Sequence, residues 1–125
     1  MTVTITPIYV AILAVLYVAL SLYVVRRRYG ANVSLGDGGD ADLIARIRMH
    51  GNFSEYAPFG LLVLLSAELA GAAALGLHLV GLSLCLGRLF HALALAKVLG
   101  PSFRKYGMVL TFLSILTGAG LGLFG

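Results

Sequence analysis

The chain has 125 residues, of which 60% are hydrophobic and 11% charged, and its formal net charge at pH 7 is +4. Soluble domains are about 45–50% apolar and about 25% charged, so this composition excludes an ordinary soluble domain and indicates a single integral membrane domain. A nucleic-acid partner is not expected, because the nine Lys and Arg residues are confined to two blocks, residues 26–48 and 88–105, beside apolar segments. The sequence has no cluster of Cys and His residues of the kind that would predict a metal site.

Four apolar segments predict an all-α, integral membrane four-helix bundle in which residues 1–125 form one domain, because about 20 apolar residues cross a bilayer. The first helix is expected over about residues 5–28. It has no charge before Arg26 and ends in Arg26-Arg27-Arg28, whereas a signal peptide begins with basic residues and has a small-residue cleavage site. We therefore expect a retained transmembrane helix.

The segment of residues 30–41 is rich in Gly and Asp and predicts a loop, with Asp40 as the N-cap of the next helix. The second helix is expected over about residues 42–70, with a kink at Pro58. Glu68 lies near its far end. We expect this acid to be solvated in the headgroup layer on that side of the membrane.

The first third of the second helix is the densest polar stretch in the chain, and its spacing predicts two polar faces. One face holds Arg48, Asn52, Glu55 and Tyr56, which stand at i, i+4, i+7 and i+8. Arg46 and His50 form a second pair that points roughly the opposite way. A charge at membrane depth costs about 2.5–3.5 kcal/mol, so both faces must meet protein, water or a ligand.

The third and fourth helices are expected over about residues 73–98 and 103–123. Arg88 and His91 stand three residues apart on one face of the third helix, and the basic pair Arg104-Lys105 opens the fourth. Both basic blocks adjoin the first and third loops. The positive-inside rule therefore predicts a multi-pass protein with these two loops in the cytoplasm and both termini on the other side of the membrane.

The polar groups of the second, third and fourth helices should thus meet at the cytoplasmic side. Arginine guanidinium groups bind carboxylates through two parallel hydrogen bonds, and a carboxylate such as that of Glu55 can hold an ammonium group. Several guanidinium groups beside an amide, a carboxylate and a phenol therefore predict a small zwitterionic or dianionic ligand.

One motif in the second helix resembles a known family. The pattern Arg48-x-His50-x-Asn52-x-x-Glu55-Tyr56-x-Pro58 is similar to the second-helix signature of the MAPEG superfamily, the membrane-associated proteins in eicosanoid and glutathione metabolism. The segment Gly87-Arg88-Leu89-Phe90-His91, the basic pair before the fourth helix and the chain length match too. The resemblance covers nearly the whole chain, is strongest to the short bacterial members and implies an inner-membrane location.

The resemblance implies a homotrimer that binds glutathione, the co-substrate, between neighbouring subunits near the cytoplasmic face. It assigns glutathione contacts to Arg48, Asn52, Glu55 and Tyr56 of one subunit and to His50 of the adjacent one. A basic residue at the end of the first helix also belongs to the family's site. Arg28 is our assignment for it, with Arg26 and Arg27 as alternatives.

Two further positions follow from the same resemblance. His91 stands where many members have a tyrosine, and we expect it at the site, although Leu95 replaces a second tyrosine one turn later. Arg104 is the expected catalytic residue, because a cation near sulfur lowers the pKa of a thiol and stabilises the thiolate. Lys105 is the alternative for this role.

The predicted function is that of a membrane-bound glutathione transferase or peroxidase, in which the glutathione thiolate attacks a lipophilic electrophile that arrives through the lipid. The expected partners are other copies of the chain, glutathione, a lipophilic small molecule and membrane lipid. A non-catalytic glutathione- or lipid-binding membrane protein is the first alternative. A small four-helix transporter is less favoured, because such proteins place an acid deep in the first span and residues 1–25 contain none.

Overall fold

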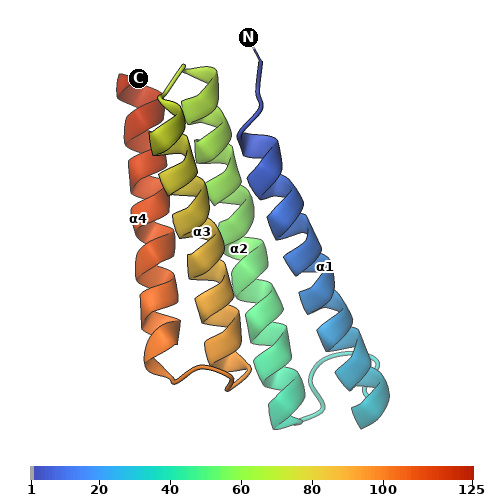
Figure 1. Cartoon of the computed structure of the whole chain (residues 1–125). Coiled ribbons are helices and arrows are strands. Elements are labelled where there is room, and N and C mark those ends of the chain that lie inside the picture. Colours follow the sequence, from blue (N-terminus) through green and yellow to red (C-terminus); the bar gives the residue numbers. More distant parts are fainter. Residues whose placement is uncertain (1) are drawn as a thin grey trace.

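The computed structural model describes residues 2–125 as four helices without a strand (Figure 1). The helices are α1 (Thr6–Ala31), α2 (Ala41–Leu69), α3 (Ala74–Leu95) and α4 (Ser102–Phe124). The prediction of an all-α four-helix protein is confirmed, with 81% of the residues helical. The largest differences from the expected helix ends are at α1, which continues to Ala31, and at α3, which stops at Leu95.

Local backbone geometry explains where these two helices end. Asn32, which follows α1, has the left-handed conformation with φ 57°, and Asn adopts this conformation more readily than most residues. After α3, Lys97 has φ 63° and therefore cannot continue a right-handed helix. Pro101 then stands at the N-cap of α4.

The helices lie side by side, and both termini are at the same end as the turn between α2 and α3 (Figure 1). The loop between α1 and α2 and the turn between α3 and α4 are at the opposite end. Among the described residues, α2 contacts each of the other helices, whereas α1 does not contact α4. α2 therefore separates the α1 side of the bundle from the α4 side.

Three helices, α1, α3 and α4, are long and apolar enough to cross a membrane, with mean hydropathies of 2.5, 1.5 and 1.8. Large apolar side chains cover their outer surfaces, as at Val15 (73% exposed) and Leu116 (70% exposed). α2 is too polar to meet the same criteria by itself. Some of its polar residues pack between the other helices, such as the buried Asn52, whereas Arg48 and Glu55 are exposed.

α3 and α4 approach each other closely at a pair of glycines. A Cβ atom at Gly107 would lie 2.6 Å from the carbonyl oxygen of Gly87 and 2.7 Å from the backbone nitrogen of His91. Because these neighbours are backbone atoms, they cannot turn away from an added side chain. The missing side chains let the backbones touch, and the next residue, Arg88, consequently reaches across to α4.

The prediction that Glu68 is a solvated acid is wrong. Its side chain is 8% exposed, and its carboxylate accepts hydrogen bonds from the backbone N–H groups of Thr4 (3.0 Å), Ile5 (2.8 Å) and Thr6 (2.7 Å). The first N–H groups of a helix have no partner within it, and the N-cap residue of α1, Ile5, has no side chain that could accept from them. Glu68 of α2 therefore caps α1, with its negative charge at the positive end of the helix dipole.

We expect Glu68→Gln to lower the free energy of unfolding in detergent by about 1–3 kcal/mol, because an amide replaces one accepting oxygen by a donor that faces N–H groups. Denaturation followed by circular dichroism measures the change. Glu55→Gln is the matched control, since Glu55 is on the same helix but exposed. Equal stability of Glu68→Gln and the wild type would show that this cap does not stabilise the bundle.

Candidate functional site

A buried guanidinium group joins three helices at the centre of the candidate site. Arg88 of α3 is 1% exposed, and its Nε and Nη2 atoms donate to Thr111 Oγ1 of α4 at 3.1 and 2.9 Å. Its Nη1 atom donates to both the backbone oxygen (3.3 Å) and the side-chain oxygen of Asn52 of α2. Nη2 also lies 3.3 Å from the sulfur of Met108. Arg88 therefore fixes the positions of α2 and α4 relative to α3.

All the acceptors around Arg88 are neutral. None of the ion pairs between described residues includes it. Its guanidinium carbon lies 5.3 Å from the ring centre of Tyr56, close enough for a favourable cation–π interaction. A charge in a medium of low polarity acts strongly on its surroundings, so Arg88 leaves this part of the bundle with an unbalanced positive field.

A histidine and two further arginines lie near this buried charge. His91, one turn after Arg88, is 3% exposed, and the charges of Arg88, Arg104 and Arg48 all act on its ring. Arg48 and Arg104 are themselves exposed. Arg104 lies in the first turn of α4, where the positive end of the helix dipole adds partial charge. We name the three arginines Arg48, Arg88 and Arg104, which lie near the His91 ring, the cationic cluster; it is suited to an anionic ligand.

The structure thus brings together five of the predicted site residues from three helices: Arg48, Asn52, Tyr56, His91 and Arg104. Arg88 belongs with them, but from the sequence we expected it only to add positive charge on the same side of the membrane. Its position in the sequence already marked it, because an isolated ionisable residue within an apolar segment is a functional candidate by itself. The contact that defines its role, to Asn52, joins residues 36 positions apart and is not visible in a local motif.

The second polar face of α2 packs against α1. The guanidinium carbon of Arg46 lies 3.7 Å from the ring centre of Tyr23, and its Nη1 atom donates to the Tyr23 carbonyl oxygen at 2.9 Å. His50 Nε2 is hydrogen-bonded to Ser21 Oγ at 3.0 Å, and its ring stacks on Tyr17 with the centres 5.0 Å apart. His50 therefore lies on the other side of α2 from the cationic cluster.

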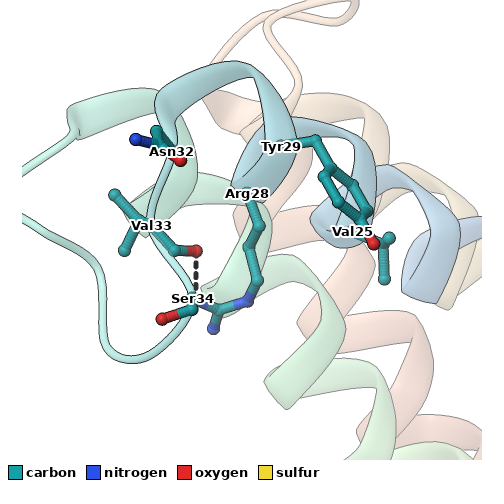
Figure 2. Close-up of a pocket in the computed structure, with 6 residues that line it drawn as sticks. All are labelled: Val25, Arg28, Tyr29, Asn32, Val33 and Ser34. Carbon is teal, nitrogen blue, oxygen red and sulfur yellow. Dashed lines mark hydrogen bonds between the residues drawn. The ribbon is translucent and has the colours of Figure 1, made fainter.

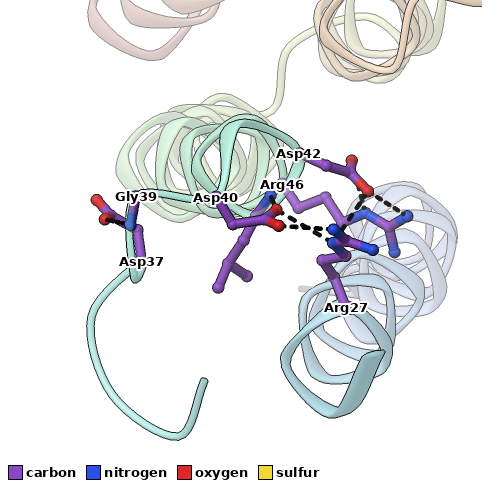
Figure 3. A network of polar contacts seen from close by, with 7 residues as sticks. Arg27, Asp37, Gly39, Asp40, Asp42 and Arg46 are labelled. Atoms are coloured by element: carbon purple, nitrogen blue, oxygen red, sulfur yellow. Dashed lines mark hydrogen bonds and ion pairs between the residues drawn. The ribbon is translucent and has the colours of Figure 1, made fainter. Parts of the chain in front are cut away.

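Ion pairs hold the end of α1 to the start of α2 (Figure 3). Arg27 pairs with Asp40 at 2.6 Å and with Asp42 at 3.4 Å, and Asp42 also pairs with Arg46 at 3.1 Å. Asp40 caps α2 as expected, accepting from the Leu43 N–H at 2.8 Å. The hydrogen bond from Arg27, followed by that from Leu43, lowers the pKa of Asp40 from 3.8 to about 2. This carboxylate therefore stays charged at any physiological pH.

Two predicted residues have no hydrogen bond or ion pair with the cationic cluster among the described residues. Glu55 is exposed and belongs to none of the ion pairs between described residues. Arg28 donates from Nη1 to the carbonyl oxygens of Gly36 (2.7 Å) and Val33 (3.5 Å) in the loop after α1. α1 and α4 do not touch within the part of the chain that the structure describes, so Arg28 and Arg104 stand on helices that are not neighbours in the same chain.

We expect Arg88→Lys to lower the free energy of unfolding by about 2–3 kcal/mol, because one ammonium group cannot reach acceptors on both α2 and α4 and leaves buried oxygens unpaired. Thermal unfolding in detergent measures the loss. Arg48→Lys is the control with the same chemical change at an exposed position. If the two variants unfold at the same temperature, the contacts of Arg88 do not stabilise the three-helix arrangement.

Comparison with known proteins assigns this arrangement to a family. The sequence profile of the MAPEG family matches residues 6–124. The inner membrane protein YecN of Escherichia coli strain K12 is 35% identical over 112 residues, which cover 90% of this chain and 85% of YecN. The protein of the same name from strain CFT073 is similar to the same extent. No solved structure matches the chain.

Proposed function

Because the chain belongs to the MAPEG family of membrane proteins, we propose that it is a glutathione transferase or peroxidase of a bacterial inner membrane. The name of its relative YecN states a location and no reaction, so the activity rests on the site. The observation that supports it best is the cationic cluster, in which buried Arg88 has no acidic partner among the described residues. Such a site favours an anion over a neutral or cationic ligand.

Several functional groups of glutathione have a complementary group on α2. The exposed Arg48 guanidinium suits one of its carboxylates, and the exposed Glu55 carboxylate suits its ammonium group. The side-chain oxygen of Asn52 already accepts from Arg88. Asn52 is therefore left with its NH2 group, which can donate to a carbonyl or carboxylate oxygen of glutathione.

Arg104 is the proposed catalytic residue. A free thiol has a pKa of about 8.5, and a neighbouring cation lowers it and raises the fraction of thiolate at neutral pH. Arg104 combines its own charge with the partial charge of the α4 N-terminus. The thiol proton would leave to solvent, and the thiolate sulfur would then form a bond to the electrophilic carbon as the leaving group departs. Lys105, also exposed, is the alternative residue.

The two faces of α2 support an assembly in which the site lies between chains. Arg48 and Asn52 face the α3–α4 side, whereas His50 packs against α1. One small molecule can contact His50 and the cationic cluster together only if they come from different chains. This requires more than one chain, and following the family resemblance we propose a homotrimer in which His50 faces glutathione bound by the neighbouring subunit.

The proposed function also implies an orientation of the protein in the membrane. The loop between α1 and α2 and the turn between α3 and α4, which adjoin the two basic blocks, lie at the end opposite the termini (Figure 1). The positive-inside rule places this end in the cytoplasm. The four helices then each cross the membrane. An apolar groove of about 290 Å³ between α1 and α2, lined by residues that include Leu13, Tyr17 and Phe53, lies on the same side of α2 as His50. In the proposed assembly it is suited to a lipophilic electrophile that meets glutathione bound by the neighbouring subunit.

We expect Arg48→Ala and Glu55→Ala each to weaken glutathione binding about tenfold or more, since each removes a charged hydrogen-bonding partner of the ligand. Isothermal titration of the detergent-purified protein measures the affinity, and conjugation to a lipophilic electrophile measures turnover. Size-exclusion chromatography checks that the assembly is intact. Unchanged affinity in both variants would refute the assigned site, and wild-type binding without turnover would identify a non-catalytic binding protein.

A further inference from the structure

The hydroxyl group of Thr111 on α4 is fully buried and uses all of its hydrogen-bonding capacity. A hydroxyl group donates one hydrogen bond and accepts two. Thr111 donates to the Gly107 carbonyl oxygen at 2.8 Å and accepts from the Nε and Nη2 atoms of Arg88 at 3.1 and 2.9 Å. A Cβ atom at Gly87 would lie 2.7 Å from this oxygen, so the hydroxyl group packs directly against α3. With 0% exposure, Thr111 cannot touch a ligand itself.

The guanidinium group of Arg88 is saturated as well. It has five N–H groups. Those on Nε and Nη2 have Thr111 Oγ1 and the sulfur of Met108 as acceptors, and those on Nη1 have the backbone and side-chain oxygens of Asn52. These five contacts leave no N–H group for a ligand. Arg88 therefore acts on a bound anion through its charge and through Asn52, not by direct contact.

The contact with Arg88 sets the orientation of the Asn52 side chain. An amide can present its oxygen or its NH2 group to a neighbour, but a guanidinium group has only donors, so the Asn52 oxygen faces Arg88. No described residue accepts a hydrogen bond from the NH2 group. Among the described residues, Thr6 Oγ1 is the fully buried side-chain atom that lacks a partner. The Asn52 NH2 group is therefore still open to an entering ligand.

We propose that Thr111 is a positioning residue of the ligand site, which acts through Arg88 to aim the Asn52 NH2 group at a hydrogen-bond acceptor of the ligand. The inference rests on the proposed function for the identity of that acceptor, a carbonyl or carboxylate oxygen of glutathione. Without the Thr111 hydroxyl group, buried N–H groups of Arg88 lose their acceptor. The guanidinium group then turns to other acceptors, and the Asn52 amide is no longer held in one orientation.

Nuclear magnetic resonance observes the Asn52 amide directly. The chain has two asparagines and no glutamine, so the side-chain amide NH2 signals of the nitrogen-15-labelled protein in detergent come from Asn52 and Asn32 alone. Asn32 follows the end of α1 (Figure 2) and serves as the internal reference. We expect Thr111→Val to shift the Asn52 signals and to leave those of Asn32 in place. Thr111→Ser keeps the hydroxyl group and should leave both close to their wild-type positions.

Glutathione affinity measures the consequence for the site. We expect Thr111→Val to weaken binding about three- to tenfold, as for one misdirected hydrogen bond to the ligand, and Thr111→Ser to restore it. In an Asn52→Ala background, Thr111→Val should cause no further loss, since the group through which it acts is gone. Ser114→Ala is the structural control, because it removes another buried hydroxyl bond between α4 and α3, to the Val80 carbonyl oxygen at 2.8 Å. It should lower stability and retain the affinity.

Thr111→Cys is a second variant, for use if Thr111→Val does not fold. Cys and Ser have nearly the same shape, and sulfur is the weaker acceptor. Thr111→Cys and Thr111→Ser therefore differ mainly in the atom that accepts from Arg88. We expect the Cys variant to shift the Asn52 signals and to weaken glutathione binding, and the Ser variant to do neither.

The Asn52 signals decide the proposal first. Unchanged signals in Thr111→Val, or in Thr111→Cys where only that variant folds, would overturn the positioning role whatever the affinity. A further loss of affinity in the Asn52→Ala background, or an equal loss in Ser114→Ala, would reduce Thr111 to a packing residue and overturn it as well. If the wild type binds no glutathione, the proposed function fails, and the resonance measurement still decides whether Thr111 orients Asn52.

Discussion

A buried positive charge that is held only by neutral groups determines how this bundle is built. Arg88 is nearly inaccessible, yet its hydrogen bonds go to Asn52 and Thr111 rather than to a carboxylate. The arrangement requires α3 and α4 to touch at Gly87 and Gly107, since a larger residue at either position would collide with backbone atoms. Replacing one of the neutral partners by an acid would cancel the field at the site. Because no ion pair between described residues neutralises Arg88, the residue that packs the helices together also supplies positive charge for the proposed anion.

The ends of α1 are attached to α2 by polar contacts. Glu68 caps the start of α1, and the ion pairs of Arg27 hold its end to Asp40 and Asp42. Because α1 has no contact with α4 among the described residues, these attachments fix the face of α2 that it covers. His50 is thereby placed beside Ser21 and faces away from Arg88. The separation of the two polar faces, on which the proposed intersubunit site depends, follows from this attachment of α1.

The sequence predicted features that depend on local spacing. Four apolar segments indicated four helices, Asp40 stood where a cap was needed, and the spacing from Arg46 to Tyr56 indicated two polar faces on α2. Contacts between distant residues were not predictable in this way. Glu68 was expected in solvent because its partners, the N–H groups of Thr4 to Thr6, are more than 60 residues away. The role of Arg88 was missed for the same reason, since Asn52 and Thr111 lie on other helices.

The most direct test of the proposed chemistry is the ultraviolet absorbance of a thiolate on addition of glutathione to the detergent-purified protein, measured alongside Arg104→Ala and Lys105→Ala. We expect a thiolate signal in the wild type and in Lys105→Ala. In Arg104→Ala the signal should be lost although glutathione still binds, because the cation next to the sulfur has been removed. Bound glutathione that remains a thiol in the wild type, or a full thiolate signal in Arg104→Ala, would contradict the assignment of Arg104 as the catalytic residue.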